Sequence, residues 1–249
     1  MIGSEKKIDL TVQWLKEQVE SSKTNGLIVG VSGGIDSALC SYLIKKAFPD
    51  NSLGVIMPCE SNPDDTKDAL KVVTNCGLKY LEIDLSSIHN KLFKMVSDKL
   101  VDVNEKLRLE LASANLKARL RMSTLYAVAN SLNYLVVGTD NAAEIYTGYF
   151  TKYGDGGVDI LPIARLTKRE VRDWSQTLGI PQEIINKTPS AGLWDNQTDE
   201  DDLGTTYNII DDFLEGKDIP EKDRLIIEKL HKISYHKRQT PLLPPEFKI

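Results

Sequence analysis

The stretch GVSGGIDSA, Gly30 to Ala38, follows a short apolar run and precedes a segment with helical periodicity. A glycine-rich turn between a strand and a helix directs backbone N–H groups and the positive end of the helix dipole at an anion. A Walker A loop would continue with Gly-Lys-Ser/Thr, but the order here is Gly-Ile-Asp-Ser. Phosphate would repel Asp36 unless a cation lay between them, so we interpret Asp36 as a Mg²⁺ ligand and place Ser37 at the phosphate. The alternative is a plain Gly-Gly turn in which both residues only cap the helix.

Segments with the apolar pattern of a strand alternate with segments with the apolar spacing of a helix along the chain around this loop. Apolar runs predict five strands, at Gly26–Ser32, Leu53–Pro58, Lys79–Leu85, Asn133–Thr139 and Val158–Ala164. Helical spacing is found at Ile8–Val19, Asp36–Ala47, Asn62–Gly77 and Thr167–Leu178. It is also found from Leu107 to Ala129, within a stretch without Gly or Pro from Val101 to Val137, which predicts one long helix. This order predicts an α/β fold, with a doubly wound, mainly parallel sheet flanked by helices. We expect one domain over residues 1–249.

The composition argues against nucleic acids and membranes as partners. A net charge of −5 argues against a broad nucleic-acid-binding face, so an anionic ligand must be small and locally bound. No segment approaches the roughly 18 apolar residues of a membrane span, and the polar N-terminus does not resemble a secretory signal. We expect a cytoplasmic protein with no membrane or nucleic-acid partner. Cys40, Cys59 and Cys76 are widely spaced and are interpreted as reduced, mostly buried thiols.

A second acid follows another predicted strand, in the stretch GTDNAAE that ends at Glu144. Taken alone, Glu144 is an ordinary acid in the first turn of a helix. Strand ends of a parallel sheet share one edge, however, so Thr139 and Glu144 should lie near Asp36. Two carboxylates suit a Mg²⁺ ion that takes its other ligands from phosphate and water.

Several motifs together resemble known families. SGGIDS resembles the pyrophosphate loop of the ATP-pyrophosphatase (PP-loop) superfamily, whose fold is of the adenine nucleotide alpha hydrolase type. From about Gly30 to Lys237 the chain more specifically resembles NAD synthetase. The motifs that carry this resemblance are GVSGGIDSA, NLKARLRM, VVGTDNAAE, YFTKYGDGGVDILPIARLTKREV, KTPSAGLWDNQTDEDDLG and YHKR.

The resemblance implies three groups of site residues. It assigns ATP binding to Gly30, Val31, Ser32, Gly33, Gly34, Ile35, Asp36, Ser37, Thr139, Lys168 and Ser190. It assigns deamido-NAD binding to Arg119, Lys152, Asp159, His236 and Lys237. Asp36 and Glu144 would hold Mg²⁺, and these two with Lys168 would be catalytic. At Gly192 the chain departs from the family, which usually has Asp after Pro-Ser-Ala.

Most of these residues also have plainer interpretations. Basic residues on the long helix are ordinarily its solvated face, and the glycine-rich segment from Gly148 to Gly157 is ordinarily a surface loop, although it could also be a lid. YHKR could be a frayed basic end. The acids Asp199, Glu200 and Asp202 suit a helix N-terminus, and we interpret them as structural.

The implied reaction is amide formation. ATP would adenylate the nicotinate carboxylate of deamido-NAD, releasing pyrophosphate, and ammonia would then displace AMP to give NAD. The chain before Gly26 is too short for a glutamine amidase, so ammonia is the expected nitrogen donor. A homodimer built on the long helix is also implied.

Two alternatives remain open. The first is another PP-loop enzyme, GMP synthetase-like or tRNA-modifying; a tRNA-modifying one would predict a basic surface and paired cysteines. The second is an adenine-nucleotide sensor that binds ATP without turnover.

Overall fold

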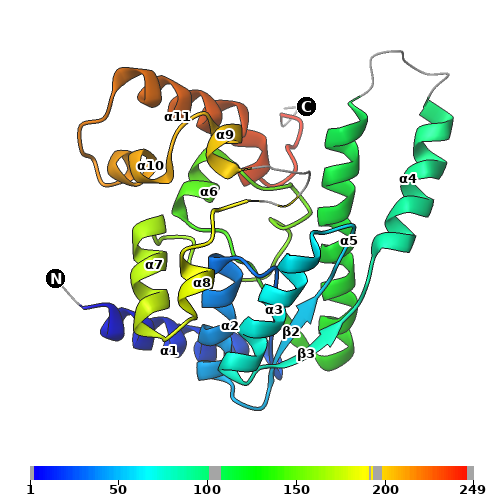
Figure 1. Ribbon diagram of the computed structural model, residues 1–249, viewed down its shortest axis with the longest axis vertical. Coiled ribbons are helices and arrows are strands. Elements are labelled where there is room, and N and C mark those ends of the chain that lie inside the picture. The colour runs from blue at the N-terminus through cyan, green and yellow to red at the C-terminus, as the bar shows by residue number, and fades with distance from the viewer. Residues whose placement is uncertain (1–2, 101–107, 191, 193–197, 246–249) are drawn as a thin grey trace.

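Four parallel strands form the centre of the molecule (Figure 1). The computed structural model describes residues 3–100, 108–190, 192 and 198–245. The strands are β1 (Gly26–Gly30), β2 (Ser52–Ile56), β3 (Lys79–Glu82) and β4 (Tyr134–Val137), in the sheet order β3-β2-β1-β4. The predicted α/β fold with a parallel sheet is confirmed.

Helices connect and extend these strands. They are α1 (Ser4–Ser22), α2 (Ile35–Ala47), α3 (Pro63–Cys76), α4 (Ser86–Leu100), α5 (Leu109–Leu132), α6 (Ala142–Thr147), α7 (Lys168–Thr177), α8 (Gln182–Ile185), α9 (Asp199–Leu203), α10 (Tyr207–Leu214) and α11 (Glu221–Ile233), followed by a 3₁₀ turn, Tyr235–Arg238. No helix within the described residues is long and apolar enough to cross a membrane.

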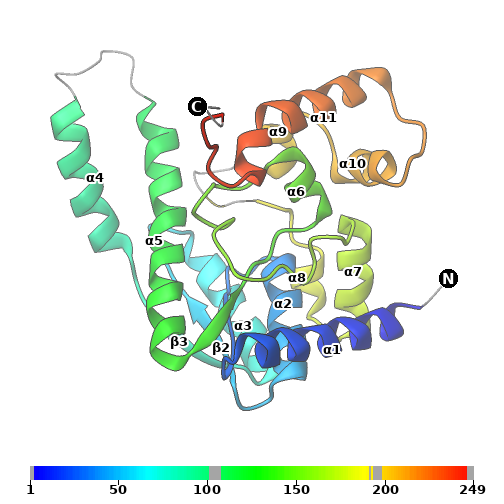
Figure 2. The same cartoon turned by 180° about the vertical axis from the view of Figure 1, so that it is seen from behind.

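Alternation along β1 places apolar side chains on both faces of the sheet. Leu27 and Val29 pack into a core with α1, α2, α3 and α7, whereas Ile28 packs on the other face with residues of α5. Helices therefore cover both faces, as the term doubly wound implies (Figure 2). Cys40 and Cys59 are buried and Cys76 is half-buried, and all three are free thiols, as predicted.

The prediction of a fifth strand at Val158–Ala164 is wrong. Only an isolated bridge joins Ile160 to Val137, and the chain then turns away from the sheet. Pro162 has no N–H group to donate to a strand ladder, which ends the pairing here.

The long predicted helix is confirmed in part. Its residues 101–107 lie outside the described part of the chain, and α5 ends at Leu132, followed by the C-cap Asn133 with a left-handed φ of 56°. The sequence interpretation missed α4, which lies beside α5 on the outer side of the molecule (Figures 1 and 2).

Candidate active site

A pocket of about 480 Å³ opens at the carboxyl ends of the strands. Its walls come from the β1–α2 loop, α5, the segment from Gly148 to Val158, and the segment between α8 and α9. Many of the predicted site residues line it: Gly30, Val31, Ser32, Gly34, Ile35, Asp36, Ser37, Thr139, Glu144, Lys168, Ser190 and Lys237.

The β1–α2 loop has the geometry of an anion cradle. Gly33 has a φ of +84°, and a Cβ there would lie 2.6 Å from the carbonyl oxygen of Asp65, so only glycine fits. Ser37 Oγ accepts the N–H of Ser32 at 3.2 Å and donates to the Gly34 carbonyl at 3.0 Å. The N-cap of α2 is Gly34, so the alternative in which Asp36 and Ser37 cap the helix is not what the structure shows.

Two carboxylates converge beside this loop. Lys168 Nζ lies 2.7 Å from Asp36 Oδ2 and 3.5 Å from Glu144 Oε1. Asn141 holds both acids in place, because its side-chain amide donates to Asp36 Oδ1 at 3.0 Å and its backbone N–H donates to Glu144 Oε2 at 2.9 Å. The second contact belongs to the capping box of α6, which fixes the direction of Glu144.

The pKa values in this cluster reflect burial and charge. Burial, followed by the negative charge of Asp36, raises the pKa of Glu144 to about 7. Burial acts to lower the pKa of Lys168, but the charges of Asp36 and Glu144 outweigh it and raise this pKa. Lys168 is only 1% exposed, so it is a buried cation held by two acids.

The cluster fits a divalent cation. Asp36 and Glu144 already aim at one shared cation, the Lys168 ammonium group, and a metal ion beside Glu144 would favour its charged form. Among the described residues, no group of three or more His, Cys, Asp or Glu side chains could hold a metal ion. A metal here would therefore take its remaining ligands from phosphate and water, as Mg²⁺ does.

The sequence interpretation missed three residues of this cluster: Asn141, described above, and Tyr207 and Asp199. The Tyr207 hydroxyl contacts Glu144 Oε1 at 3.1 Å and Asp199 Oδ2 at 2.9 Å, and its ring lies under Lys168 Nζ at 4.4 Å from the centroid. Asp199 is in the first turn of α9, as its sequence context predicts, yet its side chain is buried and lines the pocket. Sequence spacing gave no signal for either contact.

The basic residues assigned to deamido-NAD form a second group, around the Gly148–Gly157 segment. Arg119 donates to the Lys152 carbonyl at 3.3 and 3.4 Å. Lys152 Nζ donates to the carbonyls of His236 and Gln239, the latter at 3.3 Å. Lys237 Nζ donates to the carbonyls of Gly148 and Phe150 at 2.8 and 2.6 Å.

Four of the five residues assigned to deamido-NAD do not line this pocket: Arg119, Lys152, Asp159 and His236. Asp159 accepts from the Tyr126 hydroxyl at 2.9 Å and from the Val136 N–H at 2.7 Å. His236 is exposed, and its Nδ1 lies 3.2 Å from the Ile233 carbonyl. Lys152 lines a neighbouring pocket, which also includes Lys237.

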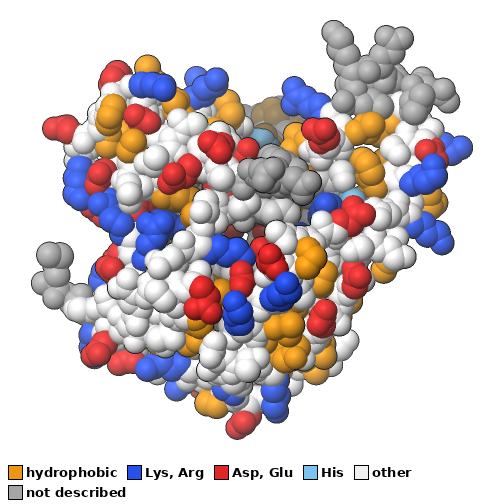
Figure 3. Space-filling view, viewed as in Figure 1, with side chains coloured by type: hydrophobic (Ala, Val, Ile, Leu, Met, Phe, Trp, Pro, Cys, Tyr) orange, Lys and Arg blue, Asp and Glu red, His pale blue; other side chains and the backbone are white. Residues whose placement is uncertain are grey.

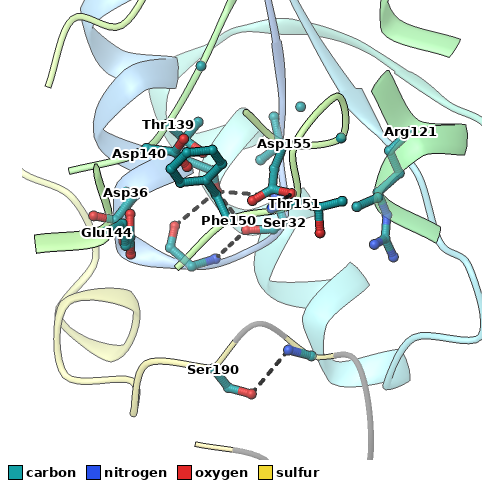
Figure 4. A pocket seen from close by; sticks show the side chains of 18 of the residues that line it. Ser32, Asp36, Arg121, Thr139, Asp140, Glu144, Phe150, Thr151, Asp155 and Ser190 are labelled. Atoms are coloured by element: carbon teal, nitrogen blue, oxygen red, sulfur yellow. Dashed lines mark hydrogen bonds between the residues drawn. The ribbon is translucent and has the colours of Figure 1, made fainter. Parts of the chain in front are cut away.

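Arg121, which the sequence interpretation did not assign, lies in the pocket wall. In Figure 4 it stands at the opposite end from Asp36 and Glu144. It donates to the Met57 carbonyl at 3.1 Å and to Ser61 Oγ at 3.0 Å, which fixes the chain after β2.

Gly192 stands where the resemblance leads us to expect an aspartate. Its φ is +60°, and a Cβ there would lie 3.6 Å from Asp65 Oδ2. An aspartate would therefore place a second carboxylate beside Asp65 on a strained backbone.

Comparison with known proteins decides the family. The sequence pattern of the family described as NAD synthase matches residues 7–241. The chain belongs to the NAD synthase family. A protein described as NH(3)-dependent NAD(+) synthetase, from Alkaliphilus metalliredigens, is 58% identical over 96% of this chain and 97% of its own length.

Solved structures agree with this assignment. An NH3-dependent NAD synthetase from Campylobacter jejuni superposes with a TM-score of 0.79 at 28% identity, covering 98% of this chain and all of that one. An NMN synthetase from Francisella tularensis superposes with a TM-score of 0.92 at 36% identity, covering 98% and 99%. The predicted PP-loop fold, NAD synthetase family and ligase class are confirmed.

Proposed function

We propose that this pocket makes NAD from deamido-NAD, ATP and ammonia, with the chain acting as one domain over residues 1–249. The observation that carries the proposal is the convergence of Asp36 and Glu144 beside a backbone anion cradle, at the ends of the neighbouring strands β1 and β4. A non-catalytic ATP sensor would have no need for two buried acids aimed at one cation.

The chemistry follows from the poor leaving group of a carboxylate. An oxygen of the nicotinate carboxylate attacks the α-phosphorus of ATP, the bond to the bridging oxygen breaks, and pyrophosphate leaves. Ammonia then attacks the acyl carbon of this adenylate, the bond from that carbon to the AMP oxygen breaks, and one proton is released. No side chain of the protein needs to form a covalent bond, so its task is to position the reactants and to compensate charge.

The phosphate loop and its neighbours would handle the triphosphate. The backbone N–H groups around Gly33 and Gly34 hold the phosphate oxygens, with Thr139 and Ser190 on the facing walls of the pocket. Mg²⁺, held by Asp36 and Glu144, would supply compensation for the charge on the triphosphate. Lys168 keeps these two acids in register and adds its own positive charge.

Deamido-NAD would bind at the other group of residues. Arg119, Lys152 and Lys237 donate mainly to neutral backbone carbonyls, and a pyrophosphate or carboxylate is a stronger acceptor than a carbonyl. In this proposal the dinucleotide takes these donors over, with Asp159 and His236 completing its site.

We further propose that the protein is a homodimer paired through α4 and α5. The outer face of α4 is apolar and exposed, with Ile88 56% and Met95 61% exposed, and Leu111 of α5 adds to it. Hydrophobic side chains are visible on this side of the molecule in Figure 3. Exposed apolar area of this kind marks interfaces, and light scattering should give twice the chain mass of 27.8 kDa.

A second candidate substrate comes from the structural comparison. The relative with the TM-score of 0.92 is an NMN synthetase, a name that implies amidation of a mononucleotide. The 58% identity to an NAD(+) synthetase favours the dinucleotide for this chain.

One assay separates these possibilities. The protein is incubated with ATP, MgCl₂ and ammonium chloride, with either deamido-NAD or nicotinate mononucleotide, and the amide product and AMP are both quantified. We expect equal amounts of NAD and AMP, and a higher kcat/KM for deamido-NAD. A preference for the mononucleotide would make the protein an NMN synthetase, and ATP binding without AMP formation would contradict the reaction proposed for this pocket.

A further inference from the structure

Lys187, in the segment between α8 and α9, is a pocket cation with no assigned role. We propose that Lys187 is a further ligand of the triphosphate and of the departing pyrophosphate, and that Asp65 and Asp68 hold it in the ligand-free protein. The proposal rests on the proposed function, because it concerns the same phosphate site.

The first argument is position. Lys187 Nζ lies 2.8 Å from Asp65 Oδ1 and 2.7 Å from Asp68 Oδ2. These two aspartates pack directly on the phosphate loop, since a Cβ at Gly33 would lie 2.6 Å from the Asp65 carbonyl oxygen and 2.9 Å from Asp68 Cβ. Lys187 is therefore separated from the loop by a single layer of side chains. Ser190, on the same segment, also lines the pocket (Figure 4).

The second argument compares the cations that line the pocket in the described part of the chain. Lys168 is buried and held by Asp36 and Glu144, and Lys237 holds the backbone of the Gly148–Gly157 segment. Arg121 lies at the far end of the pocket (Figure 4). Lys187 remains as the cation beside the phosphate loop, and its side chain is 31% exposed. A triphosphate bound to a loop without its own lysine needs such a charge.

The third argument is that moving Lys187 from Asp65 and Asp68 to a phosphate group costs little free energy. Ion pairs of partly exposed side chains are weak, and Lys71 Nζ, at 3.3 Å from Asp68 Oδ1, still compensates Asp68 when Lys187 leaves. The flexible four-carbon stem of lysine lets the ammonium group move while the backbone stays in place. Burial acts to lower the pKa of Lys187, but Asp65 and Asp68 raise it, so the group stays charged at neutral pH.

The test measures binding of inorganic pyrophosphate with MgCl₂ to the intact protein by titration calorimetry. For Lys187→Met we expect about tenfold weaker binding, the loss of one charge-assisted contact. Lys187→Arg should retain most of the affinity, and Asp68→Asn should bind pyrophosphate as well as the unchanged protein or more tightly. Lys71→Met is the charge control, because it removes a cation from the same Asp68 without touching the pocket, and it should leave binding unchanged.

Three results would overturn the proposal. Unchanged pyrophosphate binding in Lys187→Met would mean that Lys187 does not contact the phosphate groups. An equal loss of binding in Lys71→Met would mean that the effect depends only on the net charge of the region. Weaker binding in Asp68→Asn would show that Lys187 acts only by tying the segment to α3; this arm also decides the matter if Lys187→Met does not fold. Pyrophosphate binding requires no deamido-NAD, so failure here is distinguishable from failure to make NAD in the assay above.

Discussion

The two ends of the pocket hold their positive charges in different ways. Beside the phosphate loop, a buried lysine is paired with acids, as Lys168 is with Asp36 and Glu144. Around the Gly148–Gly157 segment, Lys152 and Lys237 donate to neutral backbone carbonyls. A charged partner binds more strongly than a carbonyl. The group formed by Asp36, Glu144 and Lys168 is therefore fixed before substrates arrive, and we call it the fixed end. The second end holds donors that an anionic substrate can take over.

The supporting structure matches this difference. Asp36, Glu144 and Lys168 all lie in the first turns of helices, two of which directly follow strands of the sheet. The donors of the other end lie on α5, on a loop and on the C-terminal 3₁₀ turn. Changes at the fixed end should therefore act on turnover, and changes at the other end on substrate affinity.

The largest effect is expected at the fixed end. Asp36→Asn should lower kcat by about a thousandfold, because it removes both a proposed metal ligand and one of the two acids that hold Lys168. Turnover is measured as AMP and NAD formation at saturating substrates. Circular dichroism should show an intact fold, since Glu144 still compensates Lys168.

The matched control is Asp64→Asn, which neutralises an exposed aspartate on α3 whose side chain is 71% exposed. It should retain full activity. If Asp36→Asn were folded and as active as this control, the metal assignment at the fixed end would be wrong.

A smaller effect is expected at the end of the pocket around the Gly148–Gly157 segment, which we call the exchangeable end. Arg119→Ala should raise the KM for deamido-NAD by about tenfold and leave the KM for ATP within about twofold, because its guanidinium group belongs to the proposed dinucleotide site and not to the proposed triphosphate site. Initial rates with each substrate varied in turn give both constants. Lys16→Ala, at an exposed position of α1 away from the pocket and from α4, is the control. Equal losses for both substrates would contradict the separation of the two ends.

The sequence predicts the fixed end better than the exchangeable one, for a physical reason. Strand ends of a parallel sheet must share an edge, so a loop motif and two strand endings are enough to bring Asp36 and Glu144 together. Lys168 was assigned to the same site only because of the resemblance to NAD synthetase. The contact of Tyr207 with Glu144 depends on how α10 packs on α6, and nothing in local periodicity specifies that packing.

The same limit applies elsewhere in the chain. Asp199 satisfies every rule for a helix N-terminus and is also part of the buried cluster, so its local role hid its second one. The pairing of Lys187 with α3 joins residues more than a hundred positions apart. Patterning also predicted a strand at Val158–Ala164 that Pro162 prevents.

The smallest effect is expected at Asp140, which borders both ends of the pocket. Its side chain is 5% exposed, and its Oδ2 is buried with no hydrogen-bond partner in the described structure. Burial, followed by the negative charges of Asp155, Glu144 and Asp36, raises the pKa of Asp140 well above its usual range. The folded protein therefore keeps a proton that the unfolded chain releases above about pH 4.

Stability must then fall as the pH rises through this window, with a slope of up to about 1.4 kcal/mol per pH unit from this one group. Asp140→Asn removes the titrating group, so its melting temperature should fall less between pH 5 and pH 8 than that of the unchanged protein. The comparison is made by thermal unfolding in EDTA, with the exposed Asp9→Asn on α1 as control. An asparagine that packs badly would shift the whole curve without altering its slope. Parallel curves would therefore mean that Asp140 is ionised in the folded protein, and that Lys237 of the exchangeable end compensates it.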